Sequence, residues 1–160
     1  MSAAVGLGLA GCSSMRPLYG SSGLSSDVSS ELSSIAIPEP KTRVEQLIRN
    51  DLVAAMRPAG TASDDRYTLV LKPEAKDDLT IEGATTDTLR KTVRLNVAFN
   101  LLDRRSNASA YSGRTFSQVS YDETGQSFAD MQARTNAVER AAHEVSSDIR
   151  TRLAAHFAAG

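Results

Sequence analysis

The clearest pattern in the chain is an alternation of apolar and polar side chains over residues 88–103. Five consecutive matches to a period of two predict a long strand with one buried face. The apolar positions of this strand are Val93, Leu95, Val97, Phe99 and Leu101.

Three other segments also carry strand signals. Residues 65–74 alternate, and "DLTIEG" after Pro73 continues the strand toward Gly83. Residues 110–121 follow the turn "RRSNAS" and predict a more polar return strand. The short stretch "SSIAIPEP" at residues 33–40 predicts a strand that two prolines stop.

Two segments have helical spacing instead. Residues 41–56 predict a helix that Pro58 and Gly60 close. Residues 127–157 carry one apolar stripe along roughly 45 Å of helix, which we expect to pack on the apolar face of the sheet. The order β-α-β-β-β-α predicts an α+β fold, with two helices on one face of a four-stranded, mostly antiparallel sheet and a polar, exposed second face. The stripe consists of Phe128, Met131, Thr135, Val138, Ala142, Val145, Ile149 and Leu153.

The N-terminal segment resembles a bacterial lipoprotein signal. "LAGC" at residues 9–12 resembles a lipobox, in which Cys12 is diacylated on its sulfur and becomes the mature N-terminus. The alternative is a buried or incidental cysteine. We expect a signal-peptide remnant at 1–11, a lipidated, serine-rich, flexible tether at 12–32 and one domain at 33–158. Because no Lys or Arg precedes Cys12, we expect translation to begin upstream of Met1.

Composition and motifs argue against several classes of function. The net charge of -1 gives no basic excess, so we expect no nucleic-acid partner. No run approaches the ~20 apolar residues of a membrane-spanning helix. The chain contains no G-x-S-x-G and no glycine-rich phosphate loop, while His143 and His156 point to different sides of one helix. We therefore expect a protein that is not an enzyme and has no metal or cofactor.

Charge is less even locally. Six cations stand between residues 90 and 114, opposed by Asp103 alone. One explanation is strand-end charge that discourages edge pairing. The other is an anion-binding surface, since guanidinium groups suit bidentate contact with phosphate, and lipopolysaccharide is the abundant phosphorylated anion at an outer membrane. The candidate residues are Arg90, Lys91, Arg94, Arg104, Arg105 and Arg114.

Several motifs in their joint order resemble the alphaproteobacterial lipopolysaccharide-assembly lipoproteins of the LptE family. They are "LAGC", "RPLYG", "IAIPEP", "RVEQLIRNDL" and "ARTNAVERAAHEVSSDIRTRL", between Cys12 and about Phe157. The resemblance implies the fold above and a lipid anchor on the periplasmic side of the outer membrane. It also implies a role as a plug, one to one, inside the LptD β-barrel, which inserts lipopolysaccharide into the outer leaflet, and direct contact with lipopolysaccharide. Of the family's functional residues only Cys12 carries over.

Other readings remain open. The chain could be an anchored auxiliary lipoprotein of an ABC-type lipid transporter, a periplasmic lipoprotein enzyme or a peptidoglycan-binding lipoprotein. For a barrel plug, we expect the exposed sheet face and the hairpin tip at residues 83–87 to meet the wall of the barrel.

Overall fold

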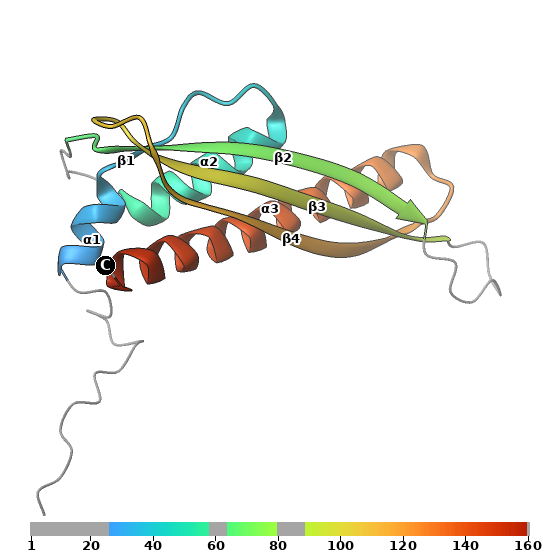
Figure 1. The fold of residues 1–160 in the computed structure, drawn as a ribbon. Helices are drawn as coiled ribbons and strands as arrows, with labels where there is room; N and C mark the ends of the chain where they lie inside the picture. The colour runs from blue at the N-terminus through green and yellow to red at the C-terminus, as the bar shows by residue number, and fades with distance from the viewer. Residues whose placement is uncertain (1–25, 58–63, 80–88, 160) are drawn as a thin grey trace, which may run out of the picture.

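The computed structural model describes residues 26–57, 64–79 and 89–159, and it confirms the α+β fold (Figure 1). The four strands form one sheet in the order β1-β2-β3-β4, in which β1 is parallel to β2 and the other pairs are antiparallel. The elements are α1 (Ser26–Ser33), β1 (Ile35–Ala36), α2 (Arg43–Met56), β2 (Tyr67–Leu79), β3 (Leu89–Asp103), β4 (Ser109–Glu123) and α3 (Ser127–Ala159).

The core lies between the helices and one face of the sheet, which we call the inner face. All five apolar positions predicted for the long strand are buried in β3, because its period of two places them all on the inner face. Between the helices and this face, α2 contributes Ile48 and Leu52, and α3 contributes Ile149 and Leu153. The opposite, outer face carries no helix.

Local chemistry explains where α2 begins. The side chain of Thr42 accepts a hydrogen bond from the N–H of Glu45 at 3.2 Å, and the carboxylate of Glu45 accepts one from the N–H of Lys41. The first bond satisfies a backbone donor that a helix N-terminus otherwise leaves open, and the second fixes the residue just before the N-cap.

The expected stripe of α3 is buried over part of its length only. Val138 to Leu153 contact the core as predicted, but Phe128 is 71% and Met131 is 56% exposed, and Thr135 is also exposed. The reason is the length of α2, which at 14 residues is about 21 Å long and lies beside one half of the sheet (Figure 1). The first turns of α3 extend beyond it.

The expected tether at 12–32 is corrected at its end. Residues 26–33 form α1, in which Val28 is 6% and Leu32 is 2% exposed. Val28 and Leu32 are four positions apart, so they lie on the same side of this serine-rich helix. α1 packs against α2 and α3. The folded domain thus includes Ser26–Ser33, ahead of the boundary at residue 33 that the sequence predicted. Cys12, the signal remnant 1–11 and the hairpin tip 83–87 lie outside the described residues.

The turn between β3 and β4 is held by its own polar groups. The Oδ1 atom of Asp103 accepts hydrogen bonds from the N–H groups of Arg105 at 2.8 Å and Ser106 at 3.0 Å. These bonds favour the ionised carboxylate, so the pKa of Asp103 lies below its usual value, with the Ser106 N–H as the largest cause. Asn107 adopts a positive φ of 54°, a conformation that asparagine tolerates better than most residues.

Candidate functional site

No helix of the described residues covers the outer face of the sheet (Figure 1). Each of β2, β3 and β4 sends alternate side chains to this face, and the strand register aligns them in rows. Residues directly opposite one another in such rows have Cβ atoms about 5 Å apart. Three neighbouring rows are Lys72–Ala98–Arg114, Glu74–Asn96–Phe116 and Lys76–Arg94–Gln118.

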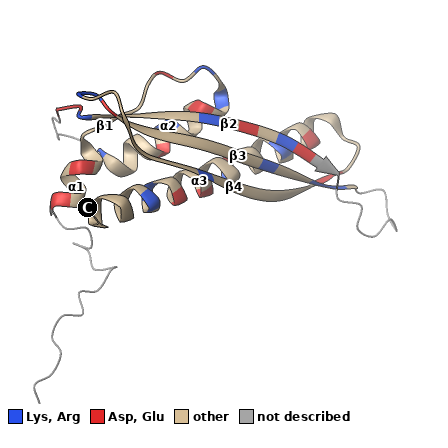
Figure 2. Ribbon diagram, in the orientation of Figure 1, with Lys and Arg blue, Asp and Glu red and all other residues tan. Residues whose placement is uncertain are grey.

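These rows hold four exposed cations, which we call the outer-face cation cluster: Lys72, Lys76, Arg94 and Arg114. Figure 2 shows basic and acidic bands alternating along β2 and a basic band on β3. Lys76 lies directly opposite Arg94, and like charges in that position destabilise a sheet. A bound anion would relieve this repulsion.

Some members of the cluster have polar neighbours. Lys76 pairs with Glu74 at 3.0 Å. Arg94 Nε is 2.8 Å from the Gln118 amide oxygen, in the amide orientation that satisfies both groups. Within the described part of the chain, neither Lys72 nor Arg114 has an ion-pair partner. Glu74 is the one acid in the three rows, so positive charge predominates there.

An aromatic ring lies among these charges. Phe116 is opposite Asn96 in the middle row and is 64% exposed. Its neighbours on the same face of β4 are Arg114 and Gln118. A ring next to Arg114, with Arg94 in the adjacent row, presents both an apolar and an electrostatic surface, which suits a ligand that carries phosphate groups next to apolar chains.

The structure separates the six cations predicted from the sequence. Arg94 and Arg114 lie on the outer face, two rows apart. Arg90 and Lys91 lie at one end of β3, and Arg104 and Arg105 follow its other end, about 44 Å away at 3.4 Å per residue.

Three of the separated cations already have partners. Arg90 pairs with Asp122 at 3.0 Å. Lys91 extends to the inner side and pairs with Glu123 at 2.6 Å, and this hydrogen bond raises the pKa of Lys91. Arg104 contacts Asp65, with Nη1 at 3.2 Å from the backbone oxygen and 3.8 Å from the carboxylate.

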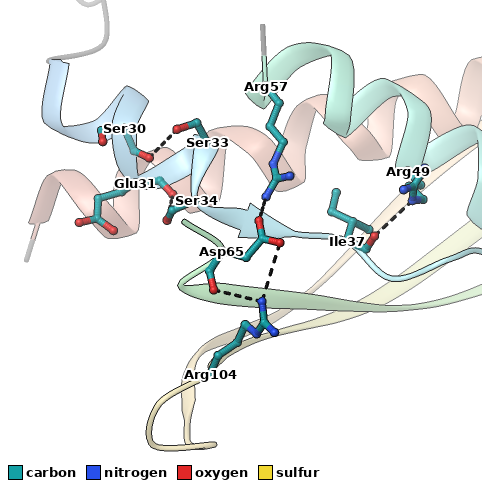
Figure 3. Close-up of polar contacts among 9 residues, drawn as sticks. All are labelled: Ser30, Glu31, Ser33, Ser34, Ile37, Arg49, Arg57, Asp65 and Arg104. Atoms are coloured by element: carbon teal, nitrogen blue, oxygen red, sulfur yellow. Dashed lines mark hydrogen bonds and ion pairs between the residues drawn. The ribbon is translucent and has the colours of Figure 1, made fainter. Parts of the chain in front are cut away.

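Arg57 reaches the same carboxylate of Asp65 from the opposite side (Figure 3). Asp65 therefore ties the end of α2 to the turn between β3 and β4. In this position Arg104 links elements of the fold, whereas Arg105 uses its backbone N–H in the turn itself.

Sequence reasoning did not select Lys72 and Lys76 as candidates. The signal was present in the period of two, since the inward positions Tyr67, Leu69 and Leu71 place the next even-numbered residues on the outer face. The charge count along residues 90–114 could not detect them, because strand pairing brings β2 to this surface from outside that stretch.

The described residues offer little other chemistry. They contain no group of three or more His, Cys, Asp or Glu side chains placed to hold a metal ion. No helix in the described ranges has the length and apolar character needed to cross a membrane.

A comparison with protein families matches residues 32–153 to the model described as LptE, lipopolysaccharide-assembly. The chain belongs to the LptE family. Membership gives it a role in lipopolysaccharide assembly, and the LptE family consists of outer-membrane lipoproteins without enzymatic activity. A comparison with curated proteins finds no match.

Solved structures agree with the LptE assignment. A crystal structure described as a lipoprotein from Caulobacter crescentus shares 28% sequence identity, with a TM-score of 0.68 and coverage of 83% of this chain and 97% of that one. A minor lipoprotein from Acinetobacter baumannii is 18% identical, with a TM-score of 0.55 and coverage of 76% and 88%, respectively. The second likeness supports the fold alone.

Proposed function

We propose that this LptE-family chain is an outer-membrane lipoprotein, anchored through Cys12, that plugs the LptD β-barrel one to one. In this role it helps to assemble the barrel and assists the insertion of lipopolysaccharide into the outer leaflet. Phosphate groups of lipopolysaccharide bind the outer-face cation cluster, and Arg94 and Arg114 make the bidentate contacts.

The observation that carries this proposal is the placement of four cations in three adjacent rows of an uncovered sheet face. Lys76 lies opposite Arg94, which concentrates positive charge in one row, and Phe116 offers apolar contact for the adjoining chains. Arg90, Lys91 and Arg104 are weaker candidates, because they lie outside the three rows, toward the two ends of β3. Arg105 lies far from the cluster along β3.

The shape of the domain supports the plug. α3 alone is about 50 Å long, and the sheet beside it gives an elongated body (Figure 1). The outer face is mainly polar, as contact with a water-lined barrel wall requires. The lipobox supports the proposed anchor, because it implies acylation at Cys12. More than one acyl chain holds a protein stably at a membrane surface.

The test of the plug is a mild-detergent pulldown of the tagged, full-length lipoprotein, with the co-purifying proteins identified by mass. A stoichiometric complex with a large outer-membrane β-barrel is the expected result. Recovery of an inner-membrane transporter instead would favour the other candidate, an anchored auxiliary lipoprotein of an ABC-type lipid transport system.

The lipopolysaccharide site has its own test. In the double variant Arg94→Gln/Arg114→Gln, we expect the affinity for purified lipopolysaccharide to fall at least tenfold, because each charged hydrogen bond contributes about 1.5–3 kcal/mol. Titration calorimetry at fixed ionic strength measures the change, since phosphate contacts are screened by salt.

A matched control removes the same charge elsewhere. Arg105 lies in the turn after β3, and Arg152 lies on exposed α3, where it pairs with Asp148. The variant Arg105→Gln/Arg152→Gln should keep the affinity of the unmodified protein. Equal losses in both variants would mean that net charge, rather than the outer-face cation cluster, binds the ligand.

A further inference from the structure

The four cations of the outer-face cation cluster form two pairs. Lys72 and Arg114 lie in one row, and Lys76 and Arg94 lie in another, with one row between them. Four residues separate the two rows along each strand, so the pairs are about 14 Å apart at about 3.4 Å per residue. A single phosphate group in contact with both pairs would have to draw long side chains across the middle row.

The middle row does not suit an anion. Its residue on β2 is Glu74, and Figure 2 shows this acidic band between two basic bands of the strand. Its residue on β4 is Phe116, whose ring is 64% exposed. Asn96 lies between them and can both donate and accept hydrogen bonds. The middle row therefore suits an uncharged part of a ligand, and it keeps the two cation pairs apart.

The first pair has a small residue between its two cations. Lys72 and Arg114 lie on either side of Ala98, about 10 Å apart across the sheet. Ala98 has the smallest side chain in the three rows, so it leaves open the space between two long side chains. Both cations are exposed, and among the described residues neither has an ion-pair partner. A phosphate group above Ala98 can accept hydrogen bonds from both sides, and we call this space the Ala98 cradle.

The second pair consists of directly adjacent residues. Lys76 lies opposite Arg94, and Arg94 Nε donates to the amide oxygen of Gln118 at 2.8 Å, which orients the guanidinium group. Lys76 pairs with Glu74 at 3.0 Å, but both side chains are more than half exposed. Because exposed ion pairs of this kind contribute little, a doubly charged phosphate group can replace Glu74 as the partner of Lys76. The second pair therefore provides a separate site for an anion.

We infer that the outer-face cation cluster binds a ligand with two phosphate groups about 14 Å apart. One phosphate group lies in the Ala98 cradle, the other lies beside Lys76 and Arg94, and an uncharged part of the ligand crosses the middle row. This inference rests on the proposed function and names the class of ligand, a molecule phosphorylated at both ends of an uncharged body. Ala98 determines the specificity, because a larger side chain would fill the space that the first phosphate group needs.

The experiment compares two probes, lipid A with two phosphate groups and lipid A with one, in the same detergent and at fixed ionic strength. Titration calorimetry measures their affinities for four full-length, tagged lipoproteins. These are the unmodified protein, Lys72→Gln/Arg114→Gln, Ala98→Leu and the control Ala110→Leu. The control makes the same change at an exposed position of β4 that lies outside both pairs. Thermal unfolding midpoints establish that each variant is folded.

The unmodified protein and Ala110→Leu should bind the lipid with two phosphate groups at least about tenfold more tightly than the lipid with one, because the second phosphate group adds charged hydrogen bonds. In Lys72→Gln/Arg114→Gln and in Ala98→Leu, we expect this preference to fall to about twofold or less, since only one phosphate group can then be held. The double variant changes only exposed side chains, so it decides the question if Ala98→Leu does not fold.

The other outcomes separate this inference from the proposed function. If the unmodified protein binds both lipids equally well, the inference is wrong and lipopolysaccharide binding stands. If the double variant or a folded Ala98→Leu protein keeps the full preference, no phosphate group lies in the Ala98 cradle and the inference is also wrong. Loss of the preference in Ala110→Leu as well would show that the effect is not local, with the same conclusion. If the unmodified protein binds neither lipid, the proposed lipopolysaccharide site fails, and the inference fails with it.

Discussion

Gly113 is the residue at which the sheet leaves least room for a side chain. It lies opposite Phe99 in the register, and a Cβ atom added to it would come within 2.7 Å of the Phe99 ring. The ring is 3% exposed and packs against Tyr111 with a centroid distance of 5.8 Å. Glycine on β4 thus makes the space that the aromatic residue on β3 fills.

This contact predicts a loss of stability in Gly113→Ala. Overpacking of a filled core costs about 1–3 kcal/mol, which exceeds the small gain from replacing a flexible glycine in a strand. Urea unfolding measures the free energy, and the exposed neighbour Ser112→Ala serves as the control. A stabilised Gly113→Ala variant would show that the Phe99 ring can move aside.

Asp103 provides a prediction about pH. Its pKa is lowered in the folded protein by the backbone N–H groups of Ser106 and Arg105, so protonation is easier in the unfolded chain. Its contribution to stability is therefore full above the usual value of 3.8 and is lost as the pH falls through the lower, folded pKa.

In Asp103→Asn, this contribution should be missing at every pH. Urea unfolding between about pH 2 and 7 measures the difference in free energy of unfolding between the two proteins. We expect a constant difference near neutrality that shrinks in acid. Parallel curves down to the lowest pH would contradict the assignment of Asp103 as an ionised turn acceptor.

At the level of elements, the clearest difference between the structure and the sequence prediction is α1, which lies in a segment that we expected to be a flexible tether. Leu32 is 2% exposed, so Leu32→Ala should lower the free energy of unfolding by about 2–4 kcal/mol. Ser29→Ala on the exposed side should change it little. Urea unfolding of both variants tests this, and an unaffected Leu32→Ala protein would mean that α1 is not part of the folded core.

The regular elements could be predicted because each has a complete pattern of its own. β3 has five inward apolar residues, and α2 has an apolar stripe with breakers beyond its end. α1 has only two apolar residues among serines, so its burial depends on surfaces that α2 and α3 supply. The exposed beginning of α3 could not be predicted, because its stripe continues unbroken where its packing partner ends.

The candidate site shows the same limit. Arg94 and Arg114 could be selected from the sequence, since both lie on polar faces of neighbouring strands. Lys72 and Lys76 join them only through the β2–β3 register, which depends on how the hairpin closes. Conversely, Arg104 and Arg105 were grouped with Arg90 and Lys91 because they are close in sequence. The length of β3 places the two pairs at opposite ends of the strand.

For the whole molecule, the proposed lipid anchor at Cys12 would decide where the domain acts. In Cys12→Ser, we expect the protein to lose acylation and to leave the membrane fraction, because the acyl chains supply its attachment. Labelling with a fatty acid and fractionation of cell envelopes measure this. Residues 26–159 should keep the same thermal stability, and a Cys12→Ser protein that remains in membranes would contradict the proposed anchor.

The early start of the fold at α1 also sets how far this domain can travel. With Cys12 acylated, 13 residues separate the anchor from Ser26, where an unfolded segment up to residue 32 would have provided 20. Thirteen residues cannot span more than about 44 Å, whatever their conformation. With the proposed anchor in place, the domain is confined to a thin layer beside the membrane, where its search for the proposed barrel is two-dimensional and its local concentration is high.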